Sequence, residues 1–94
     1  MEFVDEVMTH LHADEADKEN ITNLIADGHN VLQSHCGKFK MDDYPESKAL
    51  IKDYVRFAWN GASEHFFDSF FEKINQLRWS VISNESPDEV NQDA

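Results

Sequence analysis

The sequence predicts an all-α fold, a compact bundle of about four helices followed by an acidic C-terminal tail. Apolar residues recur at the spacing of one helix face along most of the chain. Strict alternation of apolar and polar residues over five or more positions, which is typical of strands, is absent. The 94 residues include only three Gly and two Pro, which favours long helices over many tight turns. We therefore expect a helical domain over residues 1–83 and a flexible acidic tail over residues 84–94.

Two helices are expected in the first third of the chain. The first covers residues 2–12, where acids fill the first turn and suit the positive end of the helix dipole. The second covers residues 15–36, with Asp14 as its N-cap and Gly37 as its stop. Gly28 falls near the apolar face of this helix, where a missing side chain allows another helix to approach closely. That face comprises Ile21, Leu24, Ile25, Val31, Leu32 and Cys36.

Two further helices follow a polar connection over residues 38–47. The third begins near Pro45, a residue suited to a first helical turn, and ends before Gly61. The fourth covers residues 64–82, with Ser63 as its cap. We expect the second and third helices to form a long antiparallel pair that the fourth helix closes. The strongest apolar stripe of the chain lies in this fourth helix and comprises Phe66, Phe67, Phe70, Phe71, Ile74, Leu77 and Val81.

The formal net charge of −11 is concentrated at the two ends of the chain. Residues 1–27 hold eight acids against Lys18 alone, residues 28–83 are balanced, and residues 84–94 hold four acids and no base. This charge disfavours a surface that binds DNA or an anionic membrane, because such binding requires clustered Lys and Arg. No stretch approaches the ~20 apolar residues of a membrane span, and the N-terminus lacks the pattern of a signal peptide.

Catalytic and metal chemistry has weak support. His10 and His12 lie in a His-x-His-x-Asp sequence that is similar to the zinc motif of metallo-β-lactamase-type hydrolases. On a helix, however, these two side chains diverge by about 200° and cannot share one metal. Cys36 has no CxxC partner, and neither a Gly-rich nucleophile turn nor a phosphate loop is present. We therefore expect a non-enzymatic protein with no catalytic residue, no cofactor and no metal.

Contact with a protein partner is better supported. Trp and Arg are the residue types that most often dominate protein interfaces. Trp59 lies at the end of the third helix, and Trp79, next to Arg78, falls off the apolar stripe of the fourth. The alternatives are a Trp that covers the edge of the bundle and acidic ends that are simply solvated. The residues expected to contact a partner are Glu2, Asp5, Glu6, Trp59, Arg78, Trp79, Glu85, Asp88 and Glu89.

One order of features extends over residues 2–82. A short acidic helix begins at Glu2-Phe3-Val4-Asp5-Glu6-Val7, and a second helix ends at His35-Cys36-Gly37. A loop carries Asp42-Asp43-Tyr44-Pro45, and the Phe-rich helix comes last. The most telling stretch is residues 50–61, with the sequence Leu-Ile-Lys-Asp-Tyr-Val-Arg-Phe-Ala-Trp-Asn-Gly. In this order the chain resembles the head–tail connector proteins, also called adaptor or head-completion proteins, of tailed bacteriophages.

The resemblance implies a structural subunit of the virion at the head–tail junction, assembled in the cytoplasm of the bacterial host. Such subunits form a homo-oligomeric ring of about twelve copies and can be monomeric until the portal protein templates that ring. The ring docks beneath the portal, extends the DNA channel and offers a surface to a tail-completion protein. DNA passes without specific binding, and an acidic surface is suited to this because attraction would hold the DNA back.

Two other classes of function remain open. A small acidic inhibitor, immunity or DNA-mimic protein would bind a basic nucleic-acid enzyme through its negative charge, with fast and salt-sensitive association. The acids of residues 1–27 favour this function, whereas the neutral middle of the chain disfavours it. An enzyme with an unrecognised site is the third class, and a bound metal or substrate would then raise its melting temperature.

Overall fold

The described part of the protein is built from helices alone. The computed structural model describes the backbone of residues 2–93 and the side chains of residues 2–83, so the side chains of the tail expected over residues 84–94 lie outside the described residues. The described chain contains no strand, which confirms the predicted all-α bundle. Short 3-10 turns precede α2, α3 and α4. The helices are α1 (Phe3–Leu11), α2 (Lys18–Cys36), α3 (Pro45–Trp59), α4 (Phe66–Ser69) and α5 (Phe71–Asp93).

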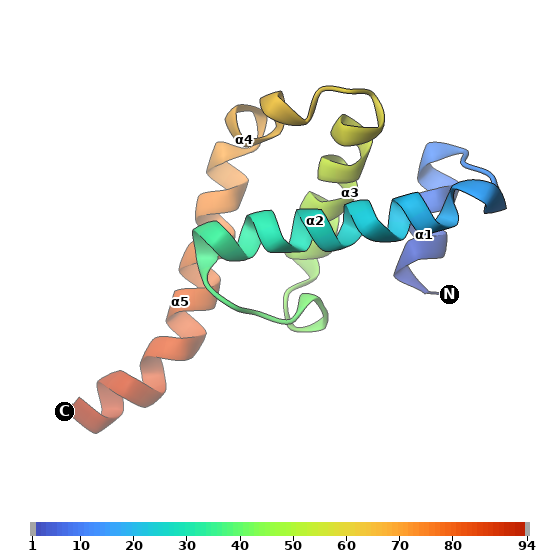
Figure 1. Ribbon diagram of the computed structural model, residues 1–94. Coiled ribbons are helices and arrows are strands. Elements are labelled where there is room, and N and C mark those ends of the chain that lie inside the picture. The colour runs from blue at the N-terminus through green and yellow to red at the C-terminus, as the bar shows by residue number, and fades with distance from the viewer. Residues whose placement is uncertain (1, 94) are drawn as a thin grey trace.

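The long helix α2 crosses the other helices of the bundle. Figure 1 shows α2 running across α3 and α5, and it packs against both. The chain then turns through α4, so that α3 and α5 run in opposite directions (Figure 1). The helix α1 folds back against the start of α2. The expected pairing of helices is therefore wrong, because the antiparallel pair is α3 with α5 and not α2 with α3.

The crossing of α2 over α3 is close because Gly28 has no side chain. A Cβ atom at this position would lie 2.9 Å from Cδ2 of Tyr54 and 3.5 Å from Cγ2 of Ile51. Real Cβ atoms do not approach ring carbons so closely, so only glycine lets α3 take this place. The close approach expected from the sequence at Gly28 is confirmed.

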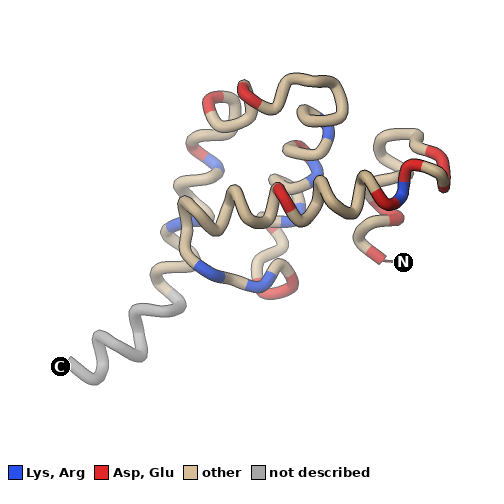
Figure 2. The backbone as a smooth tube through the Cα atoms, in the orientation of Figure 1, with Lys and Arg blue, Asp and Glu red and all other residues tan. Residues whose placement is uncertain are grey.

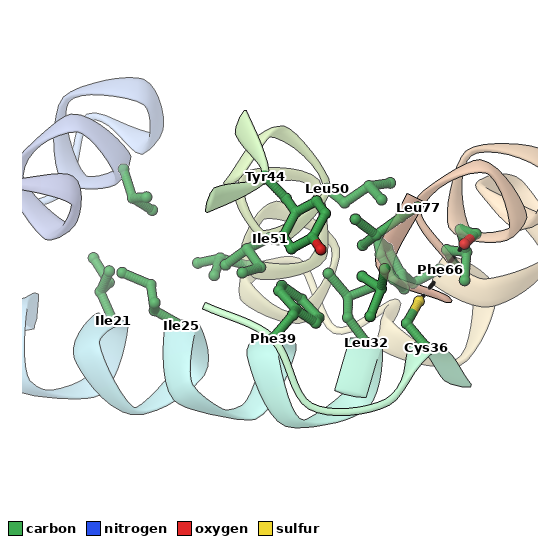
Figure 3. Close-up of a cluster of buried hydrophobic side chains, with 14 of the residues drawn as sticks. Ile21, Ile25, Leu32, Cys36, Phe39, Tyr44, Leu50, Ile51, Phe66 and Leu77 are labelled. Atoms are coloured by element: carbon green, nitrogen blue, oxygen red, sulfur yellow. Dashed lines mark hydrogen bonds between the residues drawn. The ribbon is translucent and has the colours of Figure 1, made fainter. Parts of the chain in front are cut away.

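The hydrophobic core lies where α2 crosses its neighbours. Figure 3 shows Ile21 and Ile25 towards the end of α2 near α1, and Leu32 and Cys36 towards its other end, near Leu77 of α5. Every helix except α4 contributes more than one buried side chain to this core. The side chains with an exposed fraction of 1% or less are Val7, Ile21, Leu32, Ile51, Val55, Phe66, Ile74, Leu77 and Val81, together with Ser47.

The connection between α2 and α3 is a packed loop, not the purely polar segment that the sequence suggests. Phe39 and Tyr44 are buried, and their rings meet edge to face at 5.7 Å. Side chains of α2 hold the loop backbone. His29 Nε2 donates to the carbonyl oxygen of Phe39 at 2.9 Å, and the N–H of Phe39 donates to Gln33 Oε1 at 3.2 Å. The start of α3 is fixed by the buried Ser47, whose hydroxyl donates to the Tyr44 carbonyl at 2.7 Å.

The helix expected over residues 64–82 is interrupted near its start. Residues Ser63–His65 form a 3-10 turn, α4 ends at Ser69, and Phe70 has φ −118° and ψ 20° before α5 begins. Across this bend the rings of Phe66 and Phe70 stay in contact, with centroids 5.3 Å apart, and Phe70 also meets Phe57 at 5.6 Å. A straight helix could not turn all of the adjacent Phe residues towards one core, because neighbouring side chains diverge by about 100°.

The second helix also starts later than expected. Residues Glu15–Asp17 form a 3-10 turn, and α2 begins at Lys18. The Asp17 carboxylate accepts a hydrogen bond from the N–H of Asp14 at 3.1 Å, which occupies one of the free donors at this end. The expected N-cap Asp14 therefore opens the 3-10 turn rather than α2 itself.

Candidate functional site

The five histidines are dispersed over the molecule. His10 and His12 are exposed at the end of α1, where His12 takes the left-handed conformation, φ 57°, that closes the helix. His35 packs against the ring of Phe67 at 4.5 Å, and His29 holds the loop at Phe39. Within residues 2–83, no three His, Cys, Asp or Glu side chains lie together in a way that could hold a metal ion.

The Cys36 thiol and the Tyr54 phenol have raised pKa values, and both side chains pack in or against the core. Burial raises the pKa of the Cys36 thiol, and the positive charge of Arg78 offsets this only in part. The thiol contacts the Ile74 carbonyl oxygen, with the sulfur 3.7 Å away. Burial, with the Asp27 carboxylate as a smaller cause, also raises the pKa of Tyr54. Both groups stay protonated at neutral pH, so neither supplies a nucleophile or a general base.

Several carboxylates form ion pairs within the chain. Asp5 of α1 lies 3.7 Å from the Lys18 ammonium, and Glu6 lies 3.8 Å from that of Lys52. These two acids were expected to contact a partner, and here they link α1 to α2 and α3. Exposed pairs of this kind contribute about 0–1 kcal/mol each. Their evident role is to orient α1.

The shortest ion pair, between Lys48 and Asp42, lowers the pKa of the Asp42 carboxyl group. The Lys48 ammonium lies 2.7 Å from the Asp42 carboxylate, and this hydrogen bond and its charge hold the pKa below its ordinary value. We expect Lys48→Gln to return the pKa of Asp42 to its ordinary value, as followed by NMR titration of the carboxyl carbon. A lowered folded-state pKa stabilises the fold above the ordinary pKa, and this stabilisation is lost as the pH falls through the folded-state value. Lys48→Gln should therefore reduce stability at neutral pH and not in strong acid.

The matched control for that experiment is Lys38→Gln. Lys38 is exposed and forms no ion pair with a described residue. Its replacement should leave the pKa of Asp42 low. An Asp42 pKa that stays low in Lys48→Gln would show that the ion pair is not its cause.

The residues expected to contact a partner do not gather into one surface. Glu2 is exposed at the start of α1, and Trp59 is 38% exposed at the end of α3. Arg78 and Trp79 are exposed on α5, with Trp79 exposed to 69%. Glu85, Asp88 and Glu89 lie outside the residues whose side chains the structure describes.

Two charged regions lie at opposite ends of α2 (Figure 2). The first, called the acidic corner here, comprises Asp14, Glu15, Asp17 and Glu19 at the turn between α1 and α2. The second lies where α2 ends, and it includes Lys38 in the loop and Arg78 on α5. Lys38, Lys40, Lys73 and Arg78 are the cations that form no ion pair with a described residue.

Sequence reasoning missed one exposed aromatic residue. Phe71 was expected in the core stripe, but its side chain is 48% exposed. It packs edge to face on Phe67 at 5.5 Å, and the exposed Trp79 follows eight residues further along α5. The signal was the pair Phe70-Phe71, since adjacent side chains on a helix cannot both face one core.

The described residues form two hollows. One, of 250 Å³, lies between α3 and α5 and is lined by Glu46, Ala49, Leu50, Asp53, Lys73 and Gln76. The other, of 480 Å³, is lined by residues 68–73 at the bend between α4 and α5. In the first hollow the Asp53 carboxylate is already engaged by Arg56 at 3.2 Å.

Two further findings concern membrane-spanning helices and related proteins. No helix among the described residues is both long enough and apolar enough to span a bilayer. Comparison of the chain with protein-family models, with curated proteins and with solved structures gave no match.

Proposed function

We propose that this protein is a structural subunit of a head–tail connector ring in a tailed-bacteriophage-type particle. The ring docks beneath the portal protein, extends the DNA channel and presents a surface to a tail-completion protein. The observation that carries the proposal is the order of helical elements over residues 2–82, with the segment 50–61, which covers the later part of α3 and the turn after it, at its centre. That order resembles the one found in connector proteins.

The shape of the molecule is in keeping with a ring subunit. The principal-axis extents are 53 × 29 × 15 Å, so the molecule is long and thin. A thin subunit can stand beside identical copies around an axis, because each then takes up only a small part of the circumference. Such a ring leaves a central channel without requiring a large protein.

The surface chemistry also supports a structural role. The exposed large apolar side chains are Trp59, Phe71 and Trp79, which are residue types that anchor protein contacts. The described acids outnumber the described cations, so the surface as a whole repels polyanions. A DNA conduit benefits from such repulsion, because DNA that adhered to the wall would stall.

The test is co-assembly with the portal protein encoded with this chain. The two purified proteins are mixed, sedimented together and viewed by electron microscopy. The expected result is a ring of this protein added coaxially beneath the portal, from which the copy number can be counted. Absence of co-sedimentation with a correctly assembled portal, together with absence from virions, would overturn the proposal.

The acidic corner favours a second candidate, an inhibitor of a basic nucleic-acid enzyme. Asp14, Glu15, Asp17 and Glu19 lie within six residues, and the one cation among them, Lys18, pairs with Asp5. A basic cleft would bind this corner with an affinity that falls as salt rises. Capture of a host or phage nuclease by the immobilised protein, with loss of nuclease activity that salt restores, would favour this candidate over the connector.

A further inference from the structure

We infer that copies of this chain join head to tail, with the α5 surface of one copy against the acidic corner of the next. The α5 surface is defined as Phe71, Arg78 and Trp79. The acidic corner is Asp14, Glu15, Asp17 and Glu19, as above. The inference rests on the proposed function and names the contact that would hold the ring together.

The α5 surface has the composition of an interface centre. Trp79 is 69% exposed and Phe71 is 48% exposed, whereas the other Phe side chains are buried or half-buried. Eight residues separate Phe71 from Trp79, which places the rings about two turns apart along α5 and about 80° apart around its axis. Large aromatic side chains held by a rigid helix bury much area at little cost in conformational entropy. No described segment of the chain covers them, so both rings are available to a partner.

The charge beside these rings identifies the kind of partner. Arg78 is exposed and forms no ion pair with a described residue, and its charge acts on Cys36 at the end of α2. Lys38, also exposed and unpaired within the described residues, follows that same helix end. The described part of α5 holds one acid, Glu72, against Lys73 and Arg78, so with Lys38 nearby this surface carries a small positive charge and favours an acidic partner surface.

The acidic corner of a second copy meets this requirement. Three of its four carboxylates, those of Asp14, Glu15 and Glu19, are exposed, and none of the four forms an ion pair with a described residue. Ala16 is exposed between them and offers an apolar spot on which an aromatic ring can rest. The net charge of −11 makes distant parts of two copies repel each other, but salt screens that repulsion beyond about 8 Å. The charges that face one another across the contact therefore decide the sign of the interaction.

The placement of the two surfaces determines the symmetry of the assembly. They lie at opposite ends of α2, which spans 19 residues or about 28 Å. A contact between two different surfaces is heterologous, so each copy keeps one free surface of each kind and can add another neighbour. Repetition of such a contact produces a closed ring or an open filament. It differs from the contact in a two-fold dimer, where both copies use the same patch.

Sedimentation of the full chain at physiological salt, alone and on the portal, tests the inference. Wild-type protein is expected to self-associate as its concentration rises. Trp79→Ala should weaken this association at least about tenfold, as loss of an interface anchor does. The matched control is His65→Ala, a ring exposed to 69% like that of Trp79, which precedes α4 outside both surfaces and should leave the association unchanged. Circular dichroism shows whether each variant keeps its helical fold.

A charge exchange gives the sharper arm of the test. Arg78→Glu alone and Glu15→Lys with Glu19→Lys should each weaken association, and all three substitutions in one chain should restore it. Failure of wild-type protein to self-associate either free or on the portal, unchanged association of Trp79→Ala, or no rescue by the exchange would each overturn the inference. If Trp79→Ala loses portal binding and keeps self-association, the α5 surface docks the portal and the inference is wrong.

The two proposals can fail separately in these experiments. Self-association through the exchanged charges without any binding to the portal would support the head-to-tail contact and count against the connector function. A portal-bound ring that is indifferent to Trp79→Ala and to the charge exchange would support the connector function and overturn the contact proposed here.

Discussion

Replacement of Phe66 by Ala should lower the free energy of unfolding by about 3–5 kcal/mol. The Phe66 side chain is 1% exposed, and its ring lies among those of Tyr54, Phe57 and Phe70, at centroid distances of 5.2, 6.2 and 5.3 Å. The variant loses the burial of a whole ring, leaves a cavity, and deprives three other rings of edge-to-face or tilted contacts. Urea denaturation followed by circular dichroism measures the loss.

The matched control is Phe71→Ala, five residues along the chain. The Phe71 side chain is 48% exposed, so its removal should cost less than about 1 kcal/mol. A chain of 94 residues has a total stability of about 5–14 kcal/mol, so the loss in the Phe66 variant is a large share of the total while that in the Phe71 variant is small. Equal losses in the two variants would contradict the placement of Phe66 at the centre of the core.

Replacement of Gly28 by Val should lower the free energy of unfolding by about 2–3 kcal/mol. A Cβ atom at this position already lies 2.9 Å from Cδ2 of Tyr54, and Val adds two methyl groups to it. Tyr54 cannot move away freely, because its ring packs edge to face on Phe66. The two helices must therefore separate, which loosens the contacts of both. Thermal unfolding followed by circular dichroism measures the effect.

Ala26→Val is the control for the Gly28 variant. Ala26 lies on the exposed side of the same helix, so Val there costs only helix propensity, less than about 1 kcal/mol. Wild-type stability in Gly28→Val would mean that α2 and α3 do not cross as closely as described.

The sequence predicted the helices better than it predicted their packing. Apolar periodicity located α1, α2 and α3 to within a few residues, because each has one continuous buried face. It missed the break at Phe70, since Phe66, Phe70 and Ile74 keep the spacing of one continuous helix face and the chain has no Gly or Pro at the break. It also missed the loop core at Phe39 and Tyr44, because isolated aromatic residues among polar neighbours have no period to detect. Crossing directions depend on tertiary contacts such as Tyr54 on Gly28, which are not local in sequence.

The candidate contact residues could be predicted only in part. Trp79 and Arg78 were singled out because they fall off the apolar stripe, and both are exposed. Asp5 and Glu6 were singled out for their charge alone, and charge does not reveal an ion pair with Lys18 or Lys52. The acids of residues 14–19 were counted in the charge of the first 27 residues. These acids lie at the start of α2, whereas the charge of Arg78 acts on Cys36 at the other end of that helix. Only the structure shows this separation.

The hydrogen bonds from His29 and Gln33 to Phe39 have a consequence for the order of folding. They join residues only ten and six positions apart, so the entropy lost in closing that loop is small. The contact of Cys36 with Ile74 closes 38 positions and comes at a greater entropic cost. We therefore expect α2 and its loop to form early in folding and α5 to dock late. Phe71, Arg78 and Trp79 would then reach their final positions only in chains that have completed folding, and the proposed head-to-tail contact would exclude incompletely folded copies.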